Sequence, residues 1–492
     1  MGRITRIEYK WLVAIVFLFG LFMDLMDTTI VNIAIPRLRH EFHASTSAVE
    51  WTVTGYLLSL AVFIPAAGFL SDRYGTKRIF LTAVALFVAG SAACGQAHSL
   101  PELVVFRFVQ GMGGGMMTPV GTAMLSREFP GAERAKASAI ISIPVVLAPT
   151  LGPVVGGFLI DYVSWRWIFY VNLPVGVAGF LFGLRVLKEH KEEYAQRGFD
   201  ILGLVTGGGG AAMLLYALSR AGEDGWTSRH VMGFGLGGLA VLALFAVIEL
   251  TIANPILDLR LFKRWLFTSG NLMMAPAFGA FGGFILILTL FLQDVQGYSA
   301  LRAGLIQAPG ALGTAISLPL ASRLYPTMGP RRMLMIGFGF AALTILPFIT
   351  LDLNTPIWLT IFFLFLRGMP FAFAAVASQT IIYGPLESAK QGPASSIYNT
   401  LRQAAASFGV ALIITISVDR ARAHAAAAAA SQHLSAATPE MLRHAAVMAD
   451  HEAFLAVAAL LAVPFLLTFF INDKAAQETL RRRVGEVVTA VE

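Results

Sequence analysis

Charged residues and cysteine are both scarce in this sequence. Only 13% of its 492 residues are charged and 57% are hydrophobic, whereas soluble domains carry about 25% charged residues. Lipid must therefore be the solvent for much of the chain. The single cysteine, Cys94, lies within an apolar run, which excludes a disulfide framework and a thiolate metal site. The sequence also has no G-x-x-x-x-G-K-[ST] segment, so a P-loop ATP motor is excluded.

Neither the histidines nor the net charge indicates a metal or a nucleic acid. His40 and His43 are three residues apart, but no third ligand lies near them in the sequence, so we expect no metal site. The net charge of +7 comes from lysines and arginines in short segments between apolar runs. Such charges set the orientation of membrane helices. We therefore expect contact with membrane lipid and no nucleic-acid partner.

Fourteen apolar runs in the sequence are long enough, at about 20 residues each, to cross a bilayer as helices. With a cytoplasmic N-terminus, most of the 36 lysines and arginines fall on the cytoplasmic side, as the positive-inside rule requires. An even number of spans places both termini on that side. The first run is longer than a signal-peptide core and has no A-x-A cleavage site, so we expect it to be retained. The runs lie near 11–35, 49–70, 79–97, 101–124, 136–161, 165–187, 199–220, 230–250, 266–293, 300–323, 331–351, 355–380, 394–418 and 449–471.

A polar stretch between the second and third runs is the element around which the chain is organised. It reads Gly68-Phe-Leu-Ser-Asp72-Arg73-Tyr-Gly75-Thr-Lys77-Arg78. Gly68 and Gly75 would let two helix ends approach closely and reverse tightly, and Asp72 could accept bonds from arginines. A degenerate copy, Gly329-Pro-Arg331-Arg332, follows another apolar run 254 residues later. This spacing indicates a molecule built from two repeated halves.

The repeat predicts an all-α integral membrane protein with two six-helix bundles and two extra transmembrane helices between them. The bundles would occupy residues 1–198 and 265–474, with the extra helices and a linker in 199–264 and a cytoplasmic tail in 475–492. Repeated transporters of this kind bind substrate at the interface of their halves near the membrane midplane. The long outer loop 419–448 could hold a short helix lying on the outer face, or it could form a solvated hairpin.

Two carboxylates and one arginine inside the spans are the candidates for chemistry. Asp24 and Asp27 share a face of the first helix, and ionisable groups in a membrane span mark function because they are costly there. Two such neighbours would titrate as a coupled pair, as a proton carrier requires. Arg107 lies at a depth similar to that of Asp27, so the two could form an ion pair. A purely structural role for Asp27, bonded to backbone amides or to Arg107, is the alternative.

Several motifs resemble those of the major facilitator superfamily. The stretch from Gly68 to Arg78 resembles its cytoplasmic loop motif, with Thr76 in place of one basic residue. Three further motifs resemble those of the fourteen-span drug:proton antiporters of the EmrB/QacA type, and the resemblance covers nearly the whole chain. They are Asp27-Thr-Thr-Ile-Val-Asn32-Ile-Ala-Ile-Pro36, Arg107-Phe-Val-Gln110-Gly111 and Trp165-Arg-Trp-Ile-Phe-Tyr-Val-Asn172-Leu-Pro174. The segment Gly152-Pro153-Val-Val-Gly156-Gly157 resembles the antiporter motif, although a pure packing role is the alternative.

The resemblance implies a major facilitator fold and a proton-coupled multidrug efflux transporter in a bacterial inner membrane. Its substrates would be amphipathic or aromatic small molecules, its coupling ion the proton, and it would need no cofactor. A periplasmic adaptor protein is a further partner that the resemblance suggests. The residues expected to couple transport to protons are Asp27, Asp24 and Arg107. The cytoplasmic gate falls on Gly68, Asp72, Arg73, Gly75, Lys77 and Arg78. The predicted substrate cavity is lined by Asn32, Trp51, Tyr56, Gln110, Asn271, Phe281, Arg367 and Arg402.

Other functions stay open at this point. The chain could export a lipid, a fatty acid or a metabolite, or it could be an importer. A membrane enzyme would need a catalytic cluster at one membrane face, and a sensor would need a sizeable soluble domain. The sequence shows neither feature.

Overall fold

The computed structural model of the chain describes residues 8–129, 134–191, 199–353, 355–384, 386, 388–432 and 437–471. Within these ranges the regular elements are all helices. The predicted cytoplasmic tail, 475–492, lies outside the described residues. The all-α fold that the apolar runs predict is therefore confirmed for the described part of the chain.

The helices follow the apolar runs and form two bundles with a helix pair between them in sequence. The N-terminal half contains α1 (Tyr9–Phe42), α2 (Thr46–Tyr74), α3 (Thr76–Gln96), α4 (Leu100–Glu128), α5 (Arg134–Tyr162), α6 (Trp167–Tyr170) and α7 (Asn172–Val186). The extra pair is α8 (Ile201–Asp224) and α9 (Arg229–Thr251), followed by the short helix η2 (Leu259–Lys263). The C-terminal half contains α10 (Trp265–Leu290), η3 (Phe291–Val295), α11 (Ala300–Leu343), η4 (Leu346–Thr350), α12 (Ile357–Tyr383), α13 (Ser388–Ser431), α14 (Pro439–Leu467) and η5 (Thr468–Phe470).

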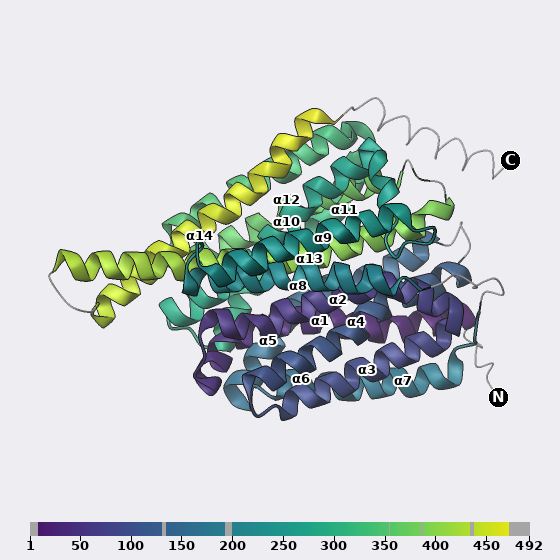
Figure 1. The fold of residues 1–492 in the computed structure, drawn as a ribbon, viewed down its shortest axis with the longest axis horizontal. Helices are drawn as coiled ribbons and strands as arrows, with labels where there is room; N and C mark the ends of the chain where they lie inside the picture. Colours follow the sequence, from purple (N-terminus) through teal and green to yellow (C-terminus); the bar gives the residue numbers. More distant parts are fainter. Residues whose placement is uncertain are drawn as a thin grey trace.

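The two halves lie side by side, with their helices running along the long axis of the molecule (Figure 1). The start of α1 and the end of α14 lie toward the same end of the bundle, which we call the terminal end, and the opposite end is the distal end. α8 packs against α2 of one half and α13 of the other, whereas α9 packs mainly on α8. The extra pair therefore covers a seam between the halves.

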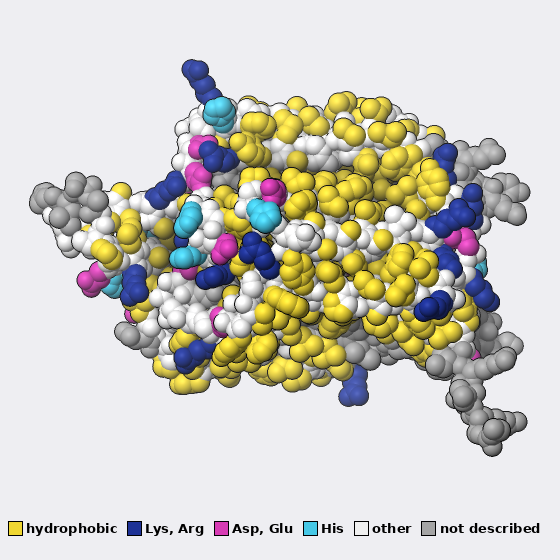
Figure 2. All heavy atoms as spheres, turned by 90° about the horizontal axis from the view of Figure 1, so that it is seen from below, with side chains coloured by type: hydrophobic (Ala, Val, Ile, Leu, Met, Phe, Trp, Pro, Cys, Tyr) yellow, Lys and Arg dark blue, Asp and Glu magenta, His cyan; other side chains and the backbone are white. Residues whose placement is uncertain are grey.

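Apolar side chains cover the middle of the face shown in Figure 2, and charged side chains gather toward its two ends. α9 also has an apolar, uncovered surface, since its only buried residues are Val231, Gly238 and Glu249. An apolar helix that leaves most of its surface uncovered is suited to hydrocarbon rather than water. The surface thus matches a protein that crosses a membrane.

Eleven helical segments in the described ranges are long and apolar enough to cross a membrane. One of them, 300–350, contains Gly329, whose φ of 74° interrupts α11 and divides it into two arms. α4 and α5 have 29 residues each, about 44 Å at 1.5 Å per residue, which exceeds the bilayer core of about 30 Å. The architecture accommodates fourteen crossings in this way, although the count itself stays a prediction.

Gly75 and Gly329 hold the same place in the two copies of the repeated motif. Gly75 ends α2 with a φ of 102°, and Gly329 has a φ of 74°. Side chains rarely tolerate such positive φ values, and glycine adopts them freely. The repeat read from the sequence therefore has a backbone counterpart in each half.

The predicted outer loop 419–448 forms a hairpin, one of the two forms expected for it, but its arms are the ends of the spanning helices rather than a separate short helix. α13 continues to Ser431 and α14 starts at Pro439, so the two helices project as a hairpin beyond the distal end (Figure 1). The run Ala425–Ala430 has the highest helix propensity available, which explains why the spanning helix continues. At the base of this distal hairpin, Glu452 accepts from Arg420 Nε over 2.7 Å.

Candidate functional site

Asp27 and Arg107 form a buried ion pair between α1 and α4. Arg107 Nη1 donates to Asp27 Oδ2 over 2.5 Å. Arg107 is 1% exposed and Asp27 is 0% exposed. Arg107 Nη1 also donates to Gln110 Oε1, and its Nε donates to the carbonyl oxygen of Thr52, each over 2.8 Å. A buried charge is tolerated when it is both paired and hydrogen-bonded. Both conditions are met here, so the pair that the matching depths suggested is present.

The second oxygen of Asp27 gathers amide donors from two other helices. Asp27 Oδ1 accepts from Gln110 Nε2 over 2.8 Å and from Asn172 Nδ2 over 3.0 Å. Asn172 is the first residue of α7, and its Nδ2 also donates to Ser91 Oγ of α3 over 3.1 Å. Asn172 belongs to the motif from Trp165 to Pro174, but no role was predicted for it, because an asparagine at a helix start does not reveal which distant carboxylate it reaches.

Asp24 has a separate set of partners and is joined to the ion pair through Tyr56. Asp24 Oδ1 accepts from the Tyr56 hydroxyl over 2.8 Å, and its Oδ2 accepts from Thr118 Oγ1 over 3.3 Å. The Tyr56 ring centre lies 3.9 Å from the guanidinium carbon of Arg107. Asp24 is 5% exposed. The two carboxylates therefore occupy linked but different environments.

The residues predicted to line a substrate cavity fall into different places. Tyr56 and Gln110 are fully buried and belong to the network just described, which corrects their assignment to a cavity wall. Asn32 and Asn271 are buried and donate to carbonyl oxygens of their own helices, since an amide side chain in a span finds the preceding turn first. Trp51 packs where α2, α8 and α13 meet.

The other three predicted cavity residues lie in the C-terminal half. The guanidinium carbon of Arg367 on α12 lies 3.6 Å from the ring centre of Phe284 and 5.4 Å from that of Phe281. Phe281 stacks on Phe371 with ring centres 5.3 Å apart. Arg402 is partly exposed on α13. Neither arginine has a carboxylate partner within the described residues.

The predicted cytoplasmic gate is held by a residue that the sequence did not single out. Glu189, from the segment after α7, accepts from the backbone N–H groups of Lys77 and Arg78 over 3.0 and 3.2 Å. A carboxylate at a helix N-terminus is stabilised by the unpaired N–H groups there. Glu189 thus caps α3 directly after the turn at Gly75. The signal was weak, because Glu189 is one of several charged residues in a short loop.

Gly68 does not have the role expected of it. It is an exposed residue inside α2, and a side chain added there would meet nothing within 4 Å. The close approach occurs at Gly75 instead, where an added Cβ would collide with the Glu189 carboxylate. Asp72 and Arg73 lie in the last turn of α2, and the latch role of Asp72 stays a prediction.

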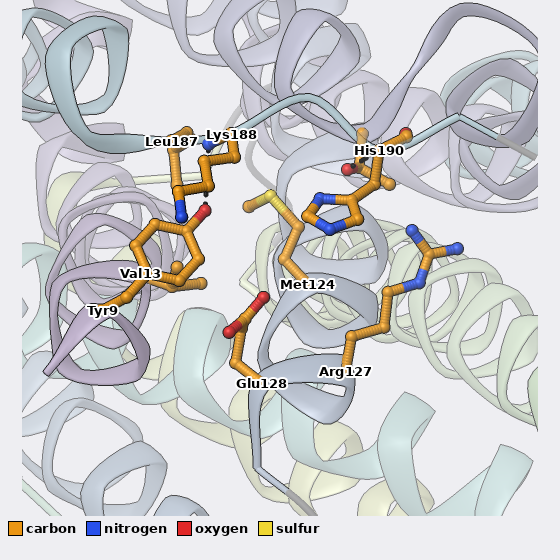
Figure 3. A pocket seen from close by; sticks show the side chains of 9 residues that line it. Tyr9, Val13, Met124, Arg127, Glu128, Leu187, Lys188 and His190 are labelled. Carbon is orange, nitrogen blue, oxygen red and sulfur yellow. Dashed lines mark hydrogen bonds between the residues drawn. The ribbon is translucent and has the colours of Figure 1, made fainter.

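A small polar pocket lies beside this gate at the terminal end (Figure 3). The backbone N–H of Lys188 donates to the hydroxyl of Tyr9 over 2.9 Å, and the carbonyl oxygen of His190 accepts from the N–H of Thr76 over 2.9 Å. Met124, Arg127 and Glu128 of α4 complete the wall. The segment after α7 therefore joins the terminal ends of α1, α3 and α4.

The glycine motif of α5 lies where this helix meets both α1 and the other half. A Cβ at Gly156 would come 2.6 Å from Ile30 Cγ1 of α1. A Cβ at Gly157 would come 2.5 Å from the backbone nitrogen of Leu301 on α11. Gly152 faces Thr29 of α1, and the carbonyl of Pro153 faces Gly304 of α11. The motif permits backbone contact between the halves that a side chain would prevent.

Polar contacts near this motif join the halves at the distal end. Asp161 of α5 accepts from the backbone N–H groups of Leu301 and Ala300 over 2.8 and 3.3 Å. Arg39 of α1 forms an ion pair with Asp294 of η3. We call these two interactions the distal closure. They connect parts of the chain more than a hundred residues apart and join the two halves at the distal end.

Comparison with known proteins places these features in a family. Residues 17–410 match the model of the Major Facilitator Superfamily. Multidrug export protein EmrB of Escherichia coli is 33% identical over 407 residues, which are 81% of this chain and 78% of EmrB. The putative multidrug resistance protein MdtD of Klebsiella pneumoniae is 32% identical over 482 residues, 96% of each chain. Among solved structures, the POT family transporter PepTSo aligns with a TM-score of 0.66 at 15% identity, covering 95% of this chain and 100% of that one.

The family model covers most of the chain, and the relatives extend over both halves. The structure adds two helical bundles, a repeated motif with a positive-φ glycine in each half, and a membrane-like surface. These findings make the protein a multi-pass membrane transporter rather than an enzyme. The chain belongs to the major facilitator superfamily.

Proposed function

We propose that this protein is a proton-driven exporter of amphipathic, aromatic drug-like compounds that works by alternating access. The observation that carries the proposal is the buried pair of Asp27 and Arg107 with Asp24 linked to it through Tyr56. An intramembrane carboxylate can persist either neutral or paired. Switching between these two forms is a means of coupling proton movement to a change of shape. The names of the relatives, which are multidrug resistance and export proteins, support the direction and the substrate class.

The Asp27 pair would exchange partners during the cycle. When the distal end opens, water reaches Asp27 and a proton neutralises it, which releases Arg107 from its strongest contact. When the distal closure forms again and the terminal end opens, the proton leaves and the pair is restored. Gln110 and Asn172 keep Asp27 in place throughout, because each donates a hydrogen bond from an uncharged amide. The closed distal end of the present structure corresponds to the paired form in this scheme.

The same proposal orients the protein in its membrane. The terminal end would face the cytoplasm of a bacterium and the distal end the periplasm, because the basic gate motif lies at the terminal end. The distal hairpin of α13 and α14 would then project into the periplasm (Figure 1), where a periplasmic adaptor protein would meet it.

The proposal is tested with inverted membrane vesicles that contain the protein. A pH gradient, acidic inside, is imposed, and the accumulation of a panel of fluorescent amphipathic dyes is followed. We expect accumulation of some dyes that collapses when the gradient is dissipated. Absence of gradient-dependent accumulation for the whole panel would contradict proton-driven export. Accumulation that persists without the pH gradient would contradict the proposal that protons drive the transport.

A further inference from the structure

Arg107 and Arg367, which lie in the two different halves, differ in how their charges are satisfied. In the N-terminal half, Arg107 has the Asp27 carboxylate, the Gln110 amide oxygen and a backbone carbonyl as acceptors. In the C-terminal half, Arg367 contacts only aromatic faces, and its buried Nε has no hydrogen-bond partner among the described residues. A guanidinium inside a membrane protein needs an acceptor. Arg367 therefore carries a positive charge that has no acceptor among the described residues.

Arg402 repeats this pattern at the interface between the halves. It forms no hydrogen bond or ion pair with any residue in the described part of the chain, and it is partly exposed. The carboxylate of Asp24 in the N-terminal half is already occupied, because its two oxygens accept from Tyr56 and Thr118. The Arg402 guanidinium is consequently available to an acceptor that the protein itself does not supply.

Aromatic rings connect the surroundings of the two arginines. Phe281 lies beside Arg367 and stacks on Phe371. Phe278 contacts both Phe371 and Tyr398, with ring centres 6.1 and 6.0 Å apart. Tyr398 lies one turn before Arg402 on α13, so the two residues share a face of that helix. This aromatic row is partly exposed at its three phenylalanines.

Polar side chains beside the row indicate that this face meets water and not lipid. Gln379 is exposed, and Ser395 and Asn399 are partly exposed, although all three lie within long helices of the bundle. Asn399 donates only to Ser395, one turn earlier on the same helix. Polar residues at this depth usually face a bundle interior or a water-filled space. The aromatic row and its arginines thus line a wet face between the halves.

We propose that Arg402, with Arg367 deeper in the same half, binds the anionic group of an aromatic substrate. The aromatic row would hold the ring system of the same molecule, while a carboxylate, phenolate or sulfonate supplies the missing acceptor. Arginine is suited to this role because its planar donors match such groups in pairs. The inference rests on the proposed function, because it names a substrate class for that exporter.

Direct binding to the purified protein in nanodiscs tests the subsite without requiring transport. Fluorescein and rhodamine 123 share a three-ring aromatic system but carry opposite charges, and their binding is measured by fluorescence anisotropy. We expect the wild type to bind fluorescein more tightly than rhodamine 123. Arg402→Gln should weaken fluorescein binding by about tenfold or more, as expected for loss of a charged hydrogen bond. Rhodamine 123 affinity should stay within about twofold.

Three further variants separate this effect from a loss of folding. Arg367→Gln should weaken fluorescein binding in the same direction, and Arg402→Lys should recover part of the affinity because it restores the charge. Arg229→Gln, at an exposed arginine of α9, is the matched control and should bind like the wild type. Tighter wild-type binding of rhodamine 123, or unchanged fluorescein affinity in both arginine-to-glutamine variants, would overturn the proposal. Parallel loss of both dyes without recovery in Arg402→Lys would overturn it as well.

The anion subsite and proton-driven export can be rejected independently of each other, because binding in nanodiscs tests the first and transport in vesicles tests the second. Vesicles that accumulate no dye would reject proton-driven export, while charge-selective binding in nanodiscs would still establish the anion subsite. Conversely, gradient-driven accumulation of rhodamine 123 with no preference for fluorescein would keep the exporter and reject the subsite.

Discussion

The hydroxyl of Tyr56 donates a hydrogen bond to Asp24 over 2.8 Å. The ring of the same tyrosine lies against the Arg107 guanidinium, which is paired with Asp27. Tyr56 is fully buried, so it cannot move without disturbing both acidic sites. We therefore expect a change in the charge of Asp24 to affect the Asp27 pair through the Tyr56 side chain.

Tyr56→Phe should weaken the coupling while leaving the fold intact. The substitution keeps the ring against Arg107 but leaves Asp24 Oδ1 without its buried donor, a loss of about 1–3 kcal/mol. We expect proton-driven transport to fall by about tenfold or more, with ligand affinity changed much less. Transport in vesicles and dye binding in nanodiscs measure the two effects. Equal losses of affinity and transport would indicate that Tyr56 acts on the ligand directly.

Gly157→Ala should prevent the distal end from closing. Its added methyl group would overlap the backbone of Leu301 on the other half, and backbone cannot rotate away as a side chain can. We expect a population shift toward the distal-open form, read as longer spin-label distances between the distal ends of α5 and α11. Gly209→Ala is the control, because a Cβ there meets nothing within 4 Å. Unchanged distances in Gly157→Ala would show that the closure tolerates the extra volume.

The ion pair of Arg39 with Asp294 should make only a small contribution to the distal closure. Both side chains are more than a third exposed, and exposed pairs contribute about 0–1 kcal/mol. Asp294→Arg should therefore shift the distal-open population by no more than about fivefold at low salt. The double exchange, Arg39→Asp with Asp294→Arg, should restore the wild-type distances. Failure of the double exchange to restore them would mean that either residue acts through other contacts.

The sequence predicted those parts of the site that follow from the energetic cost of a charge in a membrane span and from the depth of each residue in its helix. The ion pair of Asp27 and Arg107 could be predicted, because a charged side chain in a membrane span is energetically costly and the two residues lie at similar depths. Asn172 and Glu189 could not, because each is an ordinary polar residue whose importance arises only when distant segments converge. The prediction that Gly68 allows a close helix approach was wrong for a related reason. A glycine permits such an approach, but the sequence does not show whether a neighbouring segment lies there. In the distal hairpin, local helix propensity in Ala425–Ala430 indicates a helix, but it does not reveal that this helix continues from the membrane span.

Glu189→Gln should loosen the gate at the terminal end. The carboxylate caps the first turn of α3, and loss of a capping interaction costs about 0.5–2 kcal/mol. We expect faster hydrogen exchange at the N–H groups of Lys77 and Arg78 and a lower melting temperature. Glu102→Gln provides a comparison at an exposed glutamate near the start of α4, away from the gate. Protection of the α3 amides that is unaltered in Glu189→Gln would contradict the capping role.

Asp27→Asn should abolish uphill transport while preserving the fold. Asparagine has nearly the same shape and can still accept from Gln110 and Asn172, so the converging helices keep most of their hydrogen bonds. It cannot gain or lose a proton, however, and it leaves Arg107 with a buried charge that only dipoles oppose. Such a charge costs several kcal/mol when its partner is removed, so the variant should favour whichever form lets water reach Arg107. Dye binding should change little, because Asp27 is fully buried. Gradient-driven accumulation in vesicles should fall to background, while exchange of dye down its own gradient should continue.

Asp24 could take over the proton, so Asp24→Asn and the double variant are measured in parallel. If Asp27→Asn and the double variant both still drive dye against its gradient, the proton carrier lies elsewhere in the chain.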